Sequence, residues 1–287
     1  MSKIIQLVQG SQEWLEYRLK MRNASETAAM LGVSPWMSPY QLWLLKTGRS
    51  VTKTTAAMQH GTDMEPAARA AYEAQSGNVM QPLVLQDGPY SASLDGMDLD
   101  GQLIVEIKCP YKGQSSVLWN DAMVGHVPAQ YELQVQHQLM VSGAALAHLW
   151  VFDGTQGLLL PIERDDGAMD RIRGGWDVFQ TFMDSDTPPP LTDADTVQRS
   201  DLAWSAAAQA FAEAKRATDA ADTALAKARD ELVALAQHPR EQGSGVSVTR
   251  YWKAGNVAYA KIPALKDVDL ALYRGKAREE VRVTTVT

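Results

Sequence analysis

Hydrophobic and polar residues alternate along this chain with two different periods, and these periods predict its helices and strands. Apolar residues that recur every three or four positions predict helices, whereas alternation at every second position, or a short apolar run between turn residues, predicts strands. We therefore expect helices at residues 12–20, 26–32, 39–47, 58–75, 127–142, 169–183 and 201–237, and strands at 91–96, 103–108, 145–153, 158–162, 246–252 and 257–262. The stretches between these elements, including the one that precedes residue 127, are expected to be loops or turns.

The predicted strand at 103–108 (LIVEIK) is informative because its alternation places charged residues on one face. With a period of two, Ile104, Glu106 and Lys108 share one face, and the other face is entirely apolar. A carboxylate and an amine on an otherwise apolar strand are costly to bury without a partner or a function. Two Asp-Gly pairs upstream, at 95–96 and 100–101, predict that this strand and the preceding one form a hairpin.

Asp95 joins Glu106 and Lys108 in the pattern D-x(10)-E-x-K, which supplies two carboxylates and a lysine. Mg²⁺ prefers oxygen ligands and retains several waters, so two carboxylates are enough to hold it against a phosphate. A lysine beside the ion can orient the attacking water and offset charge that develops on the phosphate. The pattern therefore fits a metal-dependent phosphodiesterase. Because the pattern is short, a solvated Glu106–Lys108 pair on a surface hairpin fits it as well.

Composition narrows the class of protein without deciding its chemistry. With 287 residues, of which 45% are hydrophobic and 21% charged, the chain is expected to be a soluble globular protein with a substantial core. Its single cysteine, Cys109, excludes a disulfide scaffold and fits the cytoplasm, and neither a signal peptide nor a membrane span is expected. A net charge of −7 argues mildly against a nucleic-acid partner, although a local basic channel would suffice. The scattered histidines show no zinc spacing.

Further candidate residues lie on the predicted helices. Arg18 precedes Ser25 at the start of a helix, and a helix N-terminus with a hydroxyl and an arginine suits a phosphate. An ordinary cap beside a surface arginine is the alternative. In the helix at 58–75, Glu65 is either a solvated carboxylate or a third acid at the hairpin. In the helix at 127–142, Tyr131 and Gln134 share a face with Gln138, and such a row of glutamines is unusual on a solvated face.

The sequence changes character after residue 185. Residues 184–195 contain three consecutive prolines flanked by acidic residues, which is typical of a linker. The Ala-rich helix expected at 201–237 has an apolar seam that repeats every seven residues, as in a coiled coil or a helical hairpin; its members include Phe211, Thr218, Leu225 and Leu232. The strands at 246–252 and 257–262 predict a hairpin whose aromatic and basic residues either contact a nucleic-acid strand or pack on the core.

Five motifs occur in order along the first two thirds of the chain. They are W-x(3)-R…A-S at Trp14 to Ser25, H-G-x(3)-E at His60 to Glu65, S-x-D-G at Ser93 to Gly96, E-x-K-C-P at Glu106 to Pro110, and Y-x(2)-Q-V-Q at Tyr131 to Gln136. In this order and spacing they resemble the lambda-exonuclease-like (YqaJ-type) viral recombinases, a branch of the PD-(D/E)xK nuclease superfamily. The resemblance covers about residues 10–185. It implies an α/β fold: a nuclease core with a small mixed central sheet flanked by helices, here followed by a long helix and a β-hairpin.

The resemblance also implies a function. It implies an exonuclease that uses Mg²⁺, with Mn²⁺ as a substitute, to degrade one strand of linear double-stranded DNA in the 5′→3′ direction. The product carries a 3′ single-stranded tail for recombination by strand annealing. The implied roles are catalysis by Glu65, Asp95, Glu106, Lys108, Tyr131 and Gln134, metal binding by Asp95, Glu106 and the Ile107 carbonyl, 5′-phosphate binding by Arg18 and Ser25, and separation of the terminal base pair by an apolar wedge, Met58. Residues 19–23 are more polar than is usual in the family, and Arg22 is expected to share the charge of the phosphate site.

The partners that the resemblance implies are linear duplex DNA, a single-strand annealing protein and further copies of the chain in a ring-shaped trimer, with no membrane. The expected domains are an exonuclease core at 1–185, a linker at 186–200 and a helical and hairpin extension at 201–287. Two alternatives stay open. One is another nuclease of the superfamily, structure-specific or of opposite polarity, and the other is a scaffold that binds DNA ends without cleaving them.

Overall fold

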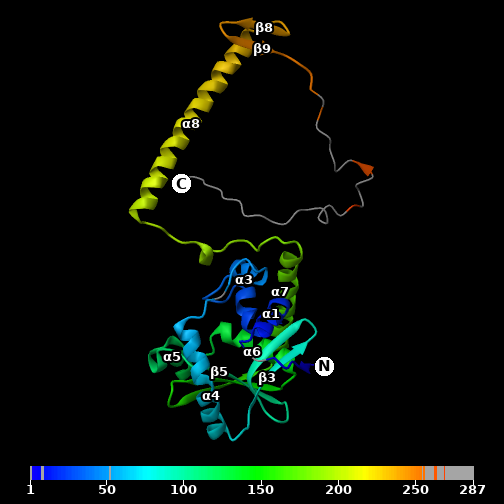
Figure 1. Cartoon of the computed structure of the whole chain (residues 1–287), viewed down its shortest axis with the longest axis vertical. Helices are drawn as coiled ribbons and strands as arrows, with labels where there is room; N and C mark the ends of the chain where they lie inside the picture. Colours follow the sequence, from blue (N-terminus) through cyan, green and yellow to red (C-terminus); the bar gives the residue numbers. More distant parts are fainter. Residues whose placement is uncertain are drawn as a thin grey trace. The chain divides into compact units, whose positions relative to one another are not determined.

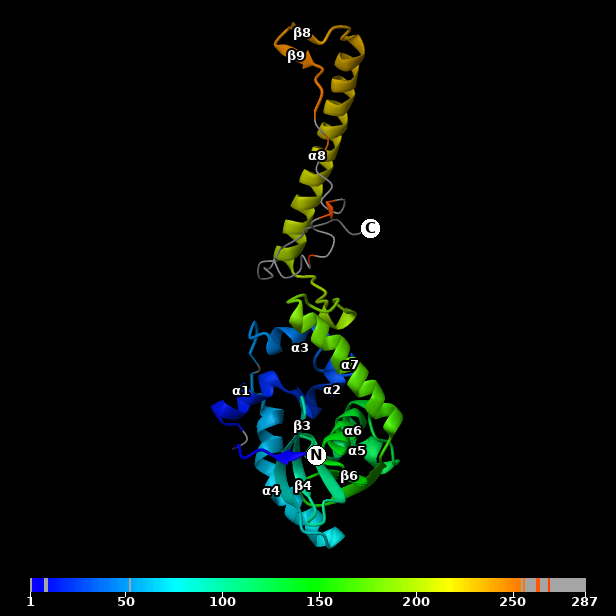
Figure 2. The same ribbon diagram turned by 90° about the vertical axis from the view of Figure 1, so that its right-hand side faces the viewer.

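The computed structural model describes residues 2–7, 10–51 and 53–253, together with residues 255, 262, 263 and 268. The chain divides into two compact units, Met1–Thr196 and Val197–Thr287, and each is described by itself (Figures 1 and 2).

The first unit is a mixed sheet with helices on both faces, which confirms the expected α/β class. The strands are β1 (Lys3–Ile4), β2 (Arg22–Asn23), β3 (Gln81–Asp87), β4 (Tyr90–Met97), β5 (Leu103–Lys108), β6 (Leu146–Phe152) and β7 (Gly157–Glu163). The helices are α1 (Gln12–Lys20), η1 (Ala24–Glu26), α2 (Thr27–Met30), α3 (Pro39–Lys46), α4 (Ala56–Ser76), η2 (Gly113–Ser115), α5 (Val117–Met123), α6 (Ala129–Ser142), α7 (Asp166–Asp184) and η3 (Asp193–Asp195).

The strands form a seven-stranded sheet in the order β1-β3-β4-β5-β6-β7, with β2 paired to β4 off this path. Strands β5 and β6 are parallel, as are β2 and β4, whereas the other pairs are antiparallel. The predicted hairpin of β4 and β5 is therefore present. It lies in the interior of the sheet, and Glu106 is buried, so Glu106 and Lys108 are not a solvated surface pair.

Strand β5 is buried on both faces, and its alternation divides the core into two layers. Ile104 packs in the larger hydrophobic cluster, which includes apolar residues of α6 and α7. Val105 and Ile107 pack on the other side, in a cluster with Ala68 and Tyr72 of α4. In Figure 2, α4 and α6 lie on opposite sides of the strands. The alternation predicted for residues 103–108 is thus confirmed.

Side-chain caps fix where five helices of this unit begin: α1, α3, α4, α5 and α7. A side-chain oxygen at each N-cap accepts a hydrogen bond from a backbone N–H in the first helical turn, as a capped N-terminus requires. The residues that do so are Ser11, Ser38, Thr55, Ser116 and Asp165. At α3 the cap is a capping box, because Gln41 also accepts from the Ser38 backbone.

Several elements of the first unit, β3 and α5 among them, were not expected from the sequence. Strand β3 forms a ladder with β4. Helix α5 occupies a stretch that was expected to be loop, and that expectation is wrong. The short VLWNDAM segment becomes helical because Ser116 caps it and Trp119 and Ala122 pack into the core. Its polar Asn-Asp pair weakens the periodic signal, so tertiary packing decides the helix.

The second unit contains α8 (Leu202–Leu235) and a hairpin of β8 (Arg240–Gly243) and β9 (Val246–Thr249). The long helix and a hairpin were expected, and both are present. In this hairpin residues 246–249 pair with 240–243, whereas the expected pairing of 246–252 with 257–262 falls largely on residues that the structure does not describe. Ser244 and Gly245 both have positive φ, 49° and 80°, which matches the tight two-residue turn of a hairpin. Residues 257–261 lie outside the described part of the chain.

The predicted seam of α8 is exposed along the helix, with Phe211 at 37% and Leu225 at 69% of full exposure. At the C-terminal end of the helix, Arg250 donates to the carbonyls of Val233 and Ala236, which would otherwise be unsatisfied. Within the described ranges, none of the helices combines the length and the apolar character that a membrane crossing needs.

A glycine in β7 provides a test of the packing. A Cβ atom at Gly157 would overlap the ring of Trp150, which is buried and donates to the carbonyl of Ala68 at 3.0 Å. We expect Gly157→Ala to lower the free energy of unfolding by about 1–3 kcal/mol, as overpacking does. The matched control is Gly174→Ala in α7, where a Cβ meets nothing within 4 Å. It should raise stability by about 0.5–1 kcal/mol. Chemical denaturation measures both, and equal effects would contradict this packing.

Candidate active site

The candidate site lies where β5 separates from β4. These strands pair only at Gly96–Val105 and Met97–Ile104, so β5 has lost its neighbour on that side by Ile107. The carboxylate of Asp95 takes the place of the missing strand, because its Oδ2 accepts from the Ile107 N–H at 2.7 Å. The N–H and C=O of one strand residue leave the strand on the same side. The Ile107 carbonyl is therefore directed to the side on which Asp95 lies.

Glu106 is buried, with only 2% of its surface exposed, and helix α6 supplies its donors. Gln134 donates to Oε1 at 2.7 Å, and Gln138 donates to Oε2 at 2.5 Å and to the Ser93 carbonyl at 3.2 Å. Lys108 completes the set with an ion pair to Oε1. The row of glutamines predicted for this helix thus contacts the predicted metal ligand directly.

Helix α4 contributes a further carboxylate and an arginine. Glu65 pairs with Arg69 one turn later, and Arg69 Nε donates to the Asp95 carbonyl at 2.6 Å. Burial raises the pKa of Glu65, and the charge of Glu106 raises it further against the opposing effects of Arg69 and Lys108. Glu65 was interpreted either as a solvated carboxylate or as a third acid at the hairpin, and the structure supports the third acid.

Negative charge is concentrated around Asp95. Burial, and then the nearby charge of Glu106, raise the pKa of Asp95 well above its usual range. Burial lowers the pKa of Lys108, but the charges of Glu106 and Asp95 outweigh it and leave that pKa above its ordinary value. Lys108 is therefore protonated at neutral pH, and it acts as a cation and a hydrogen-bond donor rather than as a base.

Two aromatic rings lie beside Lys108. Its Nζ is 5.4 Å from the centre of the Tyr131 ring, a cation–π distance. Tyr131 in turn contacts Trp36, with ring centroids 5.9 Å apart, and Trp36 is 66% exposed. Tyr131 therefore connects Lys108 to an exposed aromatic side chain.

Arg18 and Ser25 form a separate pair. Arg18 Nη2 donates to Ser25 Oγ at 2.9 Å. The expectation that Arg22 shares this site is wrong, because its guanidinium contacts Asp177 at 2.7 Å and the Tyr90 hydroxyl at 3.1 Å. Met58 is half exposed on the first turn of α4.

Strand β4 connects the Arg18–Ser25 pair with the residues around Asp95 and Glu106. Its first residues, Tyr90 and Ser91, pair with β2, which leads into η1 and Ser25. Its later residues carry Asp95 and pair with β5. Helix α6 links the same two groups of residues a second time. The Nδ1 atom of its buried His137 lies 2.6 Å from Oγ1 of Thr27, the residue that follows η1.

Several residues of these sites were not assigned a role from the sequence. Gln138 and Arg69 each lie one helical turn after a residue that was assigned, Gln134 and Glu65, and that spacing is a usable signal. Within the described residues, no place gathers three or more His, Cys, Asp or Glu side chains suited to one metal ion. A metal ion beside Asp95 and Glu106 would need main-chain oxygens, water or substrate as further ligands.

Known proteins resemble this chain in sequence and in fold. Residues 13–145 match the family model of the YqaJ-like viral recombinase domain. The uncharacterized protein YqaJ of Bacillus subtilis (strain 168) is 30% identical over 171 residues, which are 56% of this chain and 52% of that protein. The chain thus spans about half the length of this relative. The crystal structure of an alkaline exonuclease, LHK-Exo of Laribacter hongkongensis, is similar with a TM-score of 0.53 and 25% identity, covering 61% of this chain and 93% of that one. LHK-Exo in complex with dAMP gives the same values.

The buried histidine between the two sites predicts a pH dependence of stability. Burial lowers the pKa of His137 to about 3, from about 6.5 when unfolded. The unfolded state therefore binds the proton first, so stability is fully present above about pH 6.5 and is lost as the pH falls toward 3. We expect the loss through His137 to reach about 3 kcal/mol at pH 4. His137→Gln should flatten this part of the curve relative to wild type in denaturation at pH 4 to 7. Identical slopes would mean that His137 is not buried in its neutral form.

Proposed function

We propose that the protein, whose residues 13–145 match the model of the YqaJ-like viral recombinase domain, is a metal-dependent nuclease that degrades linear double-stranded DNA from its ends. One observation carries this proposal. Two carboxylates, the half-buried Asp95 and the buried Glu106, converge from separating strands beside a lysine that remains protonated. Such a cluster is costly to bury unless a cation or a substrate compensates it.

The residues at this site fit a divalent metal ion. Burial, and then the charge of Glu106, raise the pKa of Asp95, and a divalent cation beside it would favour its charged form. Asp95, Glu106 and the Ile107 carbonyl would hold the ion, and these are the hard oxygen ligands that Mg²⁺ or Mn²⁺ prefers. When bound, the ion would activate water and neutralise charge on the scissile phosphate. The glutamine amides keep Glu106 in place and leave its charge intact.

The surrounding residues take the remaining steps. Lys108 Nζ, paired with Glu106, would donate to the attacking water and to the phosphate oxygen on which charge develops. Tyr131 packs against Lys108 and limits where its ammonium can move. Gln134 orients Glu106, and Glu65 is the additional carboxylate that would receive a proton from the attacking water.

The polarity of the proposal, 5′→3′, rests on Arg18 and Ser25. An arginine that points its fork at a serine hydroxyl offers donors to a terminal phosphate. Strand β4 pairs with β2, which leads to Ser25, and β4 also carries Asp95 of the proposed metal site. A terminal phosphate and a scissile bond can therefore be held at a fixed spacing. Met58, exposed at the start of α4, is the proposed apolar wedge that parts the terminal base pair.

We further propose that the product, duplex with a 3′ single-stranded tail, passes to a single-strand annealing protein during recombination. We also propose that the protein works as a ring-shaped trimer around the DNA. Support for both comes from family resemblance. Light scattering of the full chain would test the trimer.

One digestion experiment tests the function. Purified full chain with Mg²⁺ should shorten linear duplex DNA, release label from the 5′ end first, and leave covalently closed circles intact. Cleavage of circles or flaps would favour a structure-specific nuclease. Earlier release of 3′ label would reverse the polarity, and binding without any cleavage would favour the scaffold.

Substitution of either carboxylate should remove cleavage but leave DNA binding. We expect Asp95→Ala and Glu106→Ala to abolish cleavage, because each removes a direct metal ligand, and to retain binding to duplex ends in Ca²⁺. Glu163→Ala, which removes an exposed carboxylate from β7, is the matched control and should cleave normally. Gel assays and fluorescence anisotropy measure the two properties. Normal turnover in either site variant would refute the assignment.

The proposed 5′-phosphate site should affect only how the enzyme recognises the end of the DNA. Duplex with 5′-phosphate ends should be degraded faster than the same duplex with 5′-hydroxyl ends, and Arg18→Ala should erase most of that difference. Lys20→Ala, which removes an exposed charge from the same helix, serves as control. If Arg18 instead contacts the backbone anywhere along the duplex, both substrates slow alike and the salt dependence of binding weakens.

A further inference from the structure

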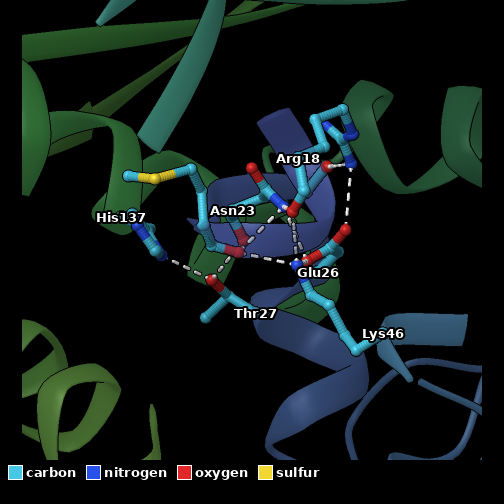
Figure 3. A network of polar contacts seen from close by, with 8 residues as sticks. Arg18, Asn23, Glu26, Thr27, Lys46 and His137 are labelled. Carbon is cyan, nitrogen blue, oxygen red and sulfur yellow. Dashed lines mark hydrogen bonds and ion pairs between the residues drawn. The ribbon is translucent and has the colours of Figure 1, made fainter. Parts of the chain in front are cut away.

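A buried lysine, Lys46, lies beside Glu26 and the backbone of Arg18 (Figure 3). Only 4% of the Lys46 side chain is exposed, and its ammonium group is fully used. It donates to the carbonyls of Arg18 and Met21 at 2.8 and 2.6 Å, and it pairs with Glu26 Oε2 at 2.6 Å. An ammonium has three donors, and each has an acceptor here. Lys46, on α3, thus fastens the end of α1 to η1.

Glu26 lies between two cations. Its Oε2 accepts from Lys46 and from Asn23 Nδ2, at 2.6 and 2.9 Å, and its Oε1 accepts from Arg18 Nη2 at 3.2 Å. The Glu26 side chain is 11% exposed. A carboxylate this buried is stable only with such partners. Its position next to Ser25 in the sequence places it where it can direct the guanidinium group.

Arg18 is consequently held on three sides. The ring of Trp14 lies 4.6 Å from its Cζ, Ser25 Oγ accepts from Nη2, and Glu26 Oε1 accepts from the same nitrogen. The Arg18 side chain nevertheless remains 21% exposed, more than either Glu26 or Lys46. An arginine with a fixed fork loses less entropy when it binds an anion.

The balance of charge explains why a lysine accompanies the glutamate. A lone Glu26 would orient Arg18 but would also cancel its charge and repel a phosphate. With Lys46 the network contains two cations and one carboxylate, so one positive charge remains for an anion. Figure 3 shows Glu26 placed between the two basic side chains.

We propose that Glu26 and Lys46 are positioning residues of the 5′-phosphate site: Glu26 fixes the Arg18 guanidinium beside Ser25, and Lys46 neutralises Glu26 while it holds the end of α1. This inference rests on the proposed function, because it assigns the network to recognition of the DNA end. The competing role is a tie that only stabilises the fold.

The test compares phosphate and hydroxyl ends in the same variants. For the full chain with Mg²⁺, kcat/KM is measured on duplex with 5′-phosphate ends and on the same duplex with 5′-hydroxyl ends. The variants are Glu26→Gln, Lys46→Met and the double variant Glu26→Gln/Lys46→Met, which leaves no unpaired buried charge and so keeps the test possible if a single variant misfolds. Arg49→Met is the matched control, since it removes a nearby basic side chain whose partner is Asp186. Anisotropy in Ca²⁺ gives the same ratio for binding.

We expect the phosphate-to-hydroxyl ratio to fall about tenfold in each of the three variants, the scale of losing an oriented charge-assisted hydrogen bond, and to stay unchanged in Arg49→Met. A merely structural role would lower both rates by one factor and leave the ratio intact, and that result would overturn the inference. A higher ratio in Glu26→Gln would also overturn it, because Glu26 would then only weaken the site. If Arg18→Ala lowers the phosphate-to-hydroxyl ratio and these variants leave it unchanged, the inference fails while the proposed function stands. If the wild type does not cleave, the proposed function fails, and the binding ratios still decide the inference.

Discussion

The structure of the core depends on one buried carboxylate in the middle of the sheet. Glu106 lies on a strand with neighbours on both sides and helices on both faces, where an unsatisfied charge would be too costly to keep. Helix α6 resolves this with Gln134 and Gln138, which reach the two carboxylate oxygens from successive turns. Amides satisfy the oxygens without cancelling the charge. An arginine in their place would add a second cation to that of Lys108 and would disfavour a metal ion at this site.

The second constraint is the separation of β4 from β5. Gly96 allows the last close contact, because a Cβ there would lie 2.7 Å from Met80 Cβ and 2.8 Å from Val105 Cγ1. Immediately before it the strands part, and Asp95 replaces the missing backbone partner of Ile107. The other end of β4 is then paired with β2. One strand therefore carries a carboxylate of the candidate active site and supports the turn that bears Ser25.

Local pattern and motif spacing predicted the elements that carry the chemistry. The alternation in LIVEIK identified the charged face, and the spacing of Tyr131, Gln134 and Gln138 identified the face of α6 that meets it. Contacts between distant segments were not predictable in this way. Lys46 and Glu26 meet only because α3 packs near the end of α1, and Arg22 is drawn to Asp177, far along the chain. The pairing of β9 with β8 depended on a Ser-Gly turn that competed with a more obvious one downstream.

The central claim is that Asp95 and Glu106 hold a divalent metal ion, and the free energy of unfolding with and without Mn²⁺ tests it most directly. An ion that binds only the folded protein stabilises it by about 2.7 kcal/mol at one hundred times its dissociation constant. The wild type should gain stability in this way as Mn²⁺ is added, whereas Glu106→Gln, which keeps the shape of the side chain but loses its charge, should gain almost none. Equal stabilisation of both proteins, or none in the wild type, would contradict the account.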